Sequence, residues 1–107
     1  MKAGETGVRE RLVSLVDYQK DSIVSREIAS RQAGTISLFA FDRGQGLNPH
    51  SSPFDAFAYV VEGRAEIAIE DKRHVLDTGE MIVIPAQRQH AIKAVDPLKM
   101  LLVMIRS

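Results

Sequence analysis

Groups of turn-forming residues divide this chain into short segments, and their spacing of about 8 to 12 residues limits the folds available to it. Between the turns lie runs of apolar and β-branched residues, such as Gly34–Phe41 and Met81–Ile84. Farther along, Ala65, Ile67 and Ile69 alternate with polar residues, which is typical of a strand with one buried face. The pattern predicts an all-β sandwich or barrel of about eight to ten strands. Because no helical period is sustained after residue 20, parallel βαβ units are excluded.

We expect strands at Ser22–Ala29, Gly34–Phe41, Phe54–Val61, Arg64–Glu70, Arg73–Leu76, Met81–Ile84, Gln89–Val95 and Lys99–Ile105. The segment Arg11–Tyr18 is expected to form a helical turn or a short strand. Asp42–Pro49 is rich in turn residues and is expected to be a break between strands. Residues 1–10 are polar and are expected to be a flexible N-terminus. The length fits a single domain over residues 1–107.

Composition excludes several functional classes. The chain has no cysteine, which excludes disulfides, thiolate zinc sites and a cysteine nucleophile. Its 14 Lys and Arg balance 14 Asp and Glu, so bulk charge predicts no nucleic-acid partner. No apolar run approaches the roughly 18 residues of a membrane span, and the first ten residues lack the apolar core of a secretory signal. We therefore expect no membrane partner and a cytoplasmic location.

Two stretches carry the informative spacings. In residues 44–63, Gly44 precedes His50 by six positions, and Gly63 ends the following strand. In residues 79–94, Pro85 follows Gly79 by six positions, and the third histidine of the chain follows Pro85 by five. Together these glycines, the proline and the histidines resemble the two motifs of the cupin superfamily, whose small barrels are of the jelly-roll type.

This resemblance covers roughly residues 34–105 and implies a jelly-roll β-barrel of the conserved-barrel cupin type. In the family, a His-x-His pair, a glutamate and a further histidine hold a metal ion inside the barrel. Here His50 and His90 match the first and last of these ligands. Ser52 takes the place of the second histidine and Ala56 that of the glutamate, and alanine cannot bind a metal.

Two interpretations of the histidine pair stay open. In the first, His50 and His90 bind one divalent metal ion (Zn, Fe, Mn, Ni or Cu), with water or neighbouring side chains completing the coordination. In the second there is no metal, and two neutral imidazoles line a pocket for a small molecule. Other candidate ligand-binding residues lie near the two motifs; they are Gln45, Ser52, Phe54, Asp55 and Gln87.

Some of these residues have specific reasons to be chosen. Strand parity turns Asp55 away from the interior, although a β-bulge would rotate it inward. Phe54 is expected to cap the mouth of the barrel. The aromatic residues elsewhere are expected in the core; they are Phe39, Phe41, Phe57 and Tyr59. His74 lies outside both motifs and is expected to be a solvated strand residue.

The sequence leaves the activity open between an enzyme and a binding module, and no catalytic residue is assigned. A metal-free enzyme would use His50 or His90 as an acid or base near neutral pH. A binding module would hold a small molecule at the same place without turnover. Because small cupins leave an apolar outer face, we expect a homodimer formed by residues 11–29 and 99–105.

Overall fold

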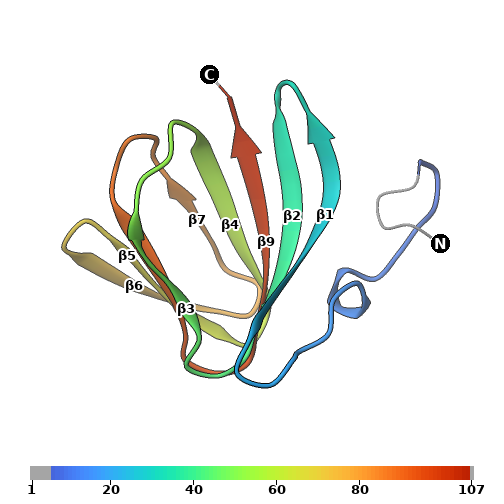
Figure 1. The fold of residues 1–107 in the computed structure, drawn as a ribbon, viewed down its shortest axis with the longest axis horizontal. Coiled ribbons are helices and arrows are strands. Elements are labelled where there is room, and N and C mark those ends of the chain that lie inside the picture. Colours follow the sequence, from blue (N-terminus) through green and yellow to red (C-terminus); the bar gives the residue numbers. More distant parts are fainter. Residues whose placement is uncertain (1–5, 107) are drawn as a thin grey trace.

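The fold consists of two antiparallel sheets, seen in a computed structural model that describes residues 6–106. The first sheet has the order β1-β2-β9-β4-β7 and the second the order β3-β8-β5-β6 (Figure 1). The strands are β1 (Ile23–Arg31), β2 (Gly34–Phe41), β3 (Gly46–His50), β4 (Asp55–Glu62), β5 (Arg64–Ile69), β6 (Lys72–Asp77), β7 (Met81–Ile84), β8 (His90–Ala94) and β9 (Leu98–Ile105). This arrangement is the predicted jelly-roll fold. Among residues 6–106, no helix is long and apolar enough to cross a membrane.

The inner faces of the two sheets make one core. Phe41, Ile67 and Leu98 are fully buried there, and Phe39 packs against this cluster. On β4, two of the side chains that face the core are small; they are Ala56 and Ala58. The expected strand boundaries agree with the structure to within two residues. The runs of alternating residues form strands with one buried face, as the alternation predicted.

Two of the aromatic residues do not lie where we expected them. Phe57 and Tyr59 are half-buried and alternate along β4 with the fully buried Ala58 and Val60. They therefore face away from the core, and the prediction that they belong to it was wrong. The β4 sequence is apolar at nearly every position, so alternation could not tell the inner face from the outer one.

One strand was missed. Asp42–Pro49 was expected to be a break, but β3 occupies its second half and pairs with β8 at the edge of the four-stranded sheet. The register of this pair is irregular between Leu47 and His50. Pro49 lies inside that irregular stretch, where a residue that cannot donate to the ladder is tolerated. Turn-forming residues in an edge strand thus hid the strand.

The N-terminal segment crosses the outer face of the five-stranded sheet. It contains the 3-10 helix η1 (Leu12–Ser14), so the alternative of a helical turn is confirmed. We call residues 11–18 the strap. Val16 of the strap is 4% exposed and packs on Leu38 and Ala40, on the face of β2 opposite the core. Of the expected flexible N-terminus, residues 1–5 lie outside the described residues, and Thr6–Glu10 contain a turn but no helix or strand.

The strap is also held by polar contacts. The Lys99 ammonium donates to the Val13 carbonyl at 2.6 Å and lies 5.1 Å from the centroid of the Tyr18 ring. The Tyr18 hydroxyl donates to a Glu62 carboxylate oxygen at 2.7 Å. Lys99 is only 8% exposed, so its charge is stabilised by a carbonyl dipole and an aromatic face rather than by water.

Candidate functional site

His50 and His90 come together at the end of the barrel where β3 finishes and β8 begins. The two residues are direct partners in the antiparallel pairing of these strands, so their side chains project from the same face. Their ring centroids are 4.2 Å apart, with an angle of 57° between the ring planes. The motif spacing therefore brings the two predicted residues into contact.

The hydrogen bonds of the two rings define which nitrogen carries the proton. Nδ1 of His50 lies 2.8 Å from the Asn48 carbonyl, and Nδ1 of His90 lies 3.4 Å from the Arg88 carbonyl. A carbonyl oxygen only accepts, so in the neutral rings Nδ1 carries the hydrogen. Within residues 6–106, Nε2 of each ring has no hydrogen-bond partner. The pair thus offers two free nitrogen lone pairs.

The two rings differ in their environment. His90 is 8% exposed, whereas His50 is exposed at the rim. Burial lowers the pKa of His90 below its usual value, and the neighbouring His50 ring lowers it further, although the Arg88 carbonyl opposes the shift. His90 is therefore neutral at pH 7, and its Nε2 accepts hydrogen bonds there.

The family's other two ligand positions do not supply a metal donor set. Ala56 is buried on the inner face of β4 and has no donor atom. Ser52 uses its hydroxyl oxygen to accept a bond from the Phe54 N–H at 3.1 Å. Asp55 is exposed, and its carboxylate accepts the Ala86 N–H at 2.8 Å. Within residues 6–106, no group of three or more His, Cys, Asp or Glu could hold a metal ion. These residues do not fit a resident metal centre, which takes at least three protein ligands.

Gln45, another predicted ligand-binding residue, lies far from the pair. Its carbonyl accepts the Ala94 N–H at 2.9 Å, at the opposite end of β8 from His90. Four residues of strand separate these two ends, which is about 13 Å. Gln45 is therefore not brought to the histidine pair.

Gln87 and Phe54 lie in the connections around the mouth. Gln87 has a positive φ of 66°, and its N–H donates to the Ser52 carbonyl at 2.8 Å. Phe54 is half-buried under the Arg106 guanidinium, 5.1 Å from its ring centroid. The β3–β4 and β7–β8 connections are thereby tied together beside the pair. The binding roles assigned to these residues from sequence stay predictions.

The inner face of the four-stranded sheet extends the site beyond the two histidines. His90 pairs with Ile69, and Ile69 pairs with Lys72, so these residues form one row with His50 across four strands. In the next row His74 is the partner of the buried Ile67. His74 is half-buried, so its expected place as a solvated residue was wrong. Strand parity counted from Ile67 would have shown this.

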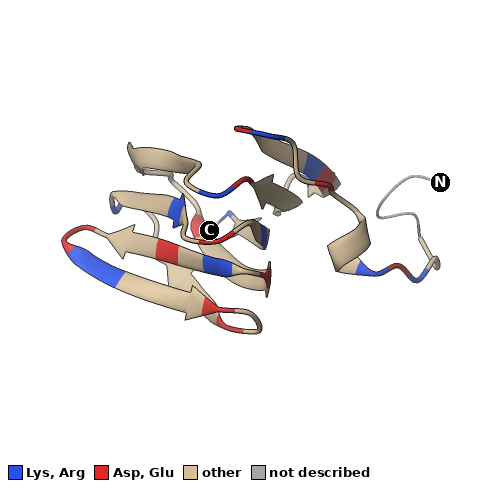
Figure 2. Cartoon of the chain, turned by 90° about the horizontal axis from the view of Figure 1, so that it is seen from below, with Lys and Arg blue, Asp and Glu red and all other residues tan. Residues whose placement is uncertain are grey.

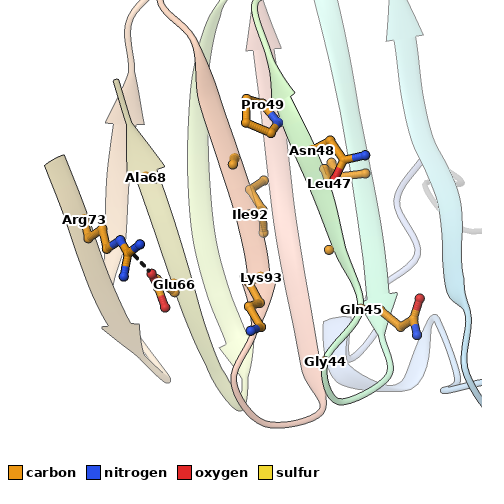
Figure 3. A pocket seen from close by; sticks show the side chains of 12 residues that line it. Gly44, Gln45, Leu47, Asn48, Pro49, Glu66, Ala68, Arg73, Ile92 and Lys93 are labelled. Carbon is orange, nitrogen blue, oxygen red and sulfur yellow. Dashed lines mark ion pairs between the residues drawn. The ribbon is translucent and has the colours of Figure 1, made fainter. Parts of the chain in front are cut away.

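The opposite face of the same sheet carries a cavity that sequence reasoning did not identify. Its volume is about 510 Å³, and it lies between β3 and β6 over the floor formed by Ala68 and Ala91 (Figure 3). Glu66 and Arg73 form an ion pair at its wall, with Nε 3.5 Å from the carboxylate oxygen. Lys93 lines the same cavity. We call it the outer trough. Elsewhere both signs of charge alternate along the strands and hairpins (Figure 2).

Comparisons with known proteins agree with this architecture. The cupin domain family matches residues 37–104. No curated protein matches the chain. A conserved protein of unknown function from Streptococcus pyogenes is 36% identical, with a TM-score of 0.91, over 96% of this chain and 90% of that one.

Two further solved structures are similar. KdgF from Halomonas sp. is 27% identical, with a TM-score of 0.72, over 86% of this chain and 87% of that one. A cupin superfamily protein from Desulfitobacterium hafniense is 24% identical, with a TM-score of 0.92, over 99% of this chain and 97% of that one, and it shows the fold alone. With its two paired sheets, its two motifs and a match over most of its length, the chain belongs to the cupin domain family.

Proposed function

We propose that the mouth of the barrel binds a small molecule that donates hydrogen bonds to Nε2 of His50 and His90. The observation that supports this proposal is that both Nδ1 atoms face backbone carbonyls, which leaves two adjacent acceptors without partners among the described residues. A polar pair beside an apolar wall is the usual composition of a ligand site. Ile69 supplies part of that wall beside His90. A ring that carries hydroxyl or N–H groups would supply the hydrogen-bond donors that fit these two acceptors.

The test is ligand-induced stabilisation across a panel of polyols, sugars, diketones and thiols. A compound that binds the folded state raises the melting temperature, and the shift grows with the logarithm of its concentration over Kd. We expect the shift to disappear in the double variant His50→Ala, His90→Ala. His74→Ala is the matched control, because it removes the third histidine and leaves the pair. Equal stabilisation of the double variant would refute the assignment of the ligand to this pair.

A metal-bound pair is the alternative outcome of the same experiment. Protein purified without a histidine tag is analysed for Zn, Fe, Mn, Ni and Cu. Stoichiometric metal that is lost in the double variant, and kept in His74→Ala, would replace the proposal with a two-histidine metal site completed by ligand or water. A metal-free protein that binds a compound from the panel supports the proposal as stated.

A proton-transfer enzyme is the second candidate, and one observation favours it. Because burial lowers the pKa of His90, its Nε2 is available as a base at neutral pH. If the chain is an enzyme, the rate with a bound compound rises with pH through the pKa of His90 and is lost in His90→Ala. If the intact protein binds the compound without turnover, the chain is a binding module and the enzyme proposal is refuted.

We also propose that the chain forms a homodimer through the uncovered part of the five-stranded sheet. Met81 and Val83 are 44% and 53% exposed, and Ile105 is 55% exposed. Half-buried Phe57 and Tyr59 lie between these strands on β4. The outward positions of β7 and of the middle of β4 are apolar, so a two-fold axis brings the same uncharged patch onto itself. Light scattering at tens of micromolar should give a dimer, and Val83→Lys should give a monomer. A monomeric wild type would refute this proposal.

A further inference from the structure

We propose that the outer trough is a second binding site, for a small hydroxylated anion such as a hydroxy acid or a sugar phosphate. The site lies on the face of the four-stranded sheet opposite the core and is separate from the histidine pair. Its volume of about 510 Å³ is in the range of small-molecule pockets. Three features of the trough support the proposal: its floor, its charges and its continuation toward the mouth.

The floor is formed by the smallest side chains. Ala68 and Ala91 are direct partners on β5 and β8, so two neighbouring outward positions carry no long side chain. On β3, Gly46 stands beside Lys93, and a Cβ added there would clash with the Ile92 carbonyl oxygen. A solvated sheet face normally carries long polar side chains at its outward positions. Their absence here leaves the depression that forms the outer trough, whose lining side chains are drawn in Figure 3.

The charges are grouped at one end of this floor. Arg73 and Lys93 provide two cations, and Glu66 lies between their strands as the single carboxylate. A carboxylate oxygen of Glu66 lies 3.5 Å from Nε of Arg73, and the guanidinium is otherwise exposed. The Lys93 ammonium has no ion-pair or hydrogen-bond partner among residues 6–106. The trough therefore has a net positive charge and carries a free cation.

This arrangement selects the chemical class of the ligand. A carboxylate or phosphate group pairs with the Lys93 ammonium and with the guanidinium nitrogens of Arg73 that Glu66 does not use. A bare anion would be repelled by Glu66, whereas a hydroxyl beside the anionic group donates a hydrogen bond to it. The amide side chains of Gln45 and Asn48 line the opposite wall and offer both donors and acceptors.

The trough continues toward the mouth of the barrel. A smaller cavity of about 100 Å³ shares Pro49, Ala68 and Ala91 with it. This second cavity is also lined by Gln89 and by His90. A ligand longer than one ring would therefore extend along the floor toward the strand that carries His90.

The experiment is a titration of the ¹⁵N-labelled full chain with two probes, glucose 6-phosphate and gluconate, with glucose as the uncharged control. We expect saturable shifts of the Ala68, Ala91 and Lys93 amides with at least one probe and none with glucose. Binding of the phosphate probe alone assigns the site to phosphorylated sugars, and binding of gluconate alone assigns it to hydroxy acids. The absence of saturable binding by both probes would overturn the proposal.

Variants separate this site from a general charge effect and from the mouth. Arg73→Gln with Lys93→Gln should weaken binding by about tenfold or more, because two charge-assisted contacts are lost. Ala68→Leu keeps every charge and should also weaken binding by filling the floor. Lys20→Gln with Arg43→Gln removes the same charge elsewhere and should leave the affinity unchanged. An equal loss in this last variant would show nonspecific attraction and overturn the proposal.

A final variant makes the two proposed sites distinguishable. His50→Ala keeps His90 in the lining of the smaller cavity, weakens binding at the mouth and should leave the probe affinity in the outer trough within about twofold. Loss of probe binding in that variant would place the anion at the histidine pair and refute the separate site. If the probes still bind this variant, and no compound of the earlier panel binds the histidine pair in the wild type, the proposed function is refuted and the proposal of the outer trough stands.

Discussion

Two basic side chains are equally buried in this barrel, and they serve it in different ways. Lys99 and His90 are each 8% exposed. The Lys99 ammonium is held at 2.6 Å by the Val13 carbonyl and lies over the Tyr18 ring. Among the described residues, His90 has one hydrogen bond, from Nδ1 to the Arg88 carbonyl at 3.4 Å, and its other nitrogen has no hydrogen-bond partner.

The difference shows what separates a structural residue from a candidate functional one. A buried cation that is held by a carbonyl and an aromatic ring stabilises the fold, whereas a ring nitrogen that has no protein partner and is open to water is available to a ligand. Burial alone, which is the same for both residues, does not distinguish them. The comparison predicts that changes at Lys99 affect folding and that changes at His90 affect binding.

The largest effect is expected from Lys99→Glu. The new carboxylate would face the Val13 carbonyl oxygen and would stand beside Glu62, its pairing partner on β4. An uncompensated buried charge costs ~3–5 kcal/mol of unfolding free energy. Urea unfolding followed by circular dichroism measures this cost. Lys93→Gln is the control on the exposed side of β8, because it places no second carboxylate opposite Glu66, and it should change the unfolding free energy by less than about 0.5 kcal/mol.

A matched pair of apolar substitutions separates the two residues more sharply. Lys99→Met keeps most of the side-chain volume but leaves the Val13 carbonyl without its donor, which costs ~1–3 kcal/mol. His90→Leu removes a long hydrogen bond and the ring contact with His50, so we expect a change of less than about 1 kcal/mol. Urea midpoints at pH 7.5 give both values. A larger loss in His90→Leu than in Lys99→Met would reverse our interpretation.

Tyr18→Phe tests one contact of the strap alone. It removes the hydroxyl that donates to Glu62 at 2.7 Å and keeps the ring under the ammonium of Lys99. We expect a loss of ~1 kcal/mol, as is typical of a single partly buried hydrogen bond. The thermal midpoint should fall by ~4–8 °C. Tyr59→Phe, on the outer face of β4, serves as the control for removing a tyrosine hydroxyl.

The smallest expected effect is a pH dependence that belongs to His90. Its folded pKa lies below the unfolded value of 6.5, because burial disfavours the charged ring. Between these two values the unfolded chain binds more protons than the native one, so stability falls as the pH decreases through this window. Below the folded pKa the loss is complete. Comparing urea midpoints of wild type and His90→Leu from pH 7.5 to 5 should show a shallower slope in the variant.

The sequence predicted the parts of the site that depend on local spacing. The match of Ala56 to a family ligand position placed that residue inside, strand parity then placed Asp55 outside, and burial agrees with both. The motif spacing placed His50 and His90 at one site through the family resemblance, whereas their direct pairing was not predicted, because β3 was expected to be a break. In contrast, the contact between Val13 and Lys99 joins residues 86 positions apart, and no local pattern indicates it.

The outer trough escaped prediction for a related reason. Glu66 was correctly expected on the outer face of its strand, but its neighbours on that face come from β6 and β8. Only the register between the strands shows that Ala68 stands beside Ala91 and leaves a depression. Side chains on one strand are predicted by period, whereas the shape of a sheet face depends on which strands are neighbours.

The edge position of β3 has a consequence for how the histidine pair moves. β8 is hydrogen-bonded on both sides, whereas β3 is bonded to β8 alone and its register breaks before His50. Edge strands with broken ladders open at lower free energy than central ones. We therefore expect His90 to stay fixed on β8 and His50 to move when β3 opens. Amide hydrogen exchange would reveal this motion as weaker protection along β3 than along β8, and a ligand held between the rings would remove the difference.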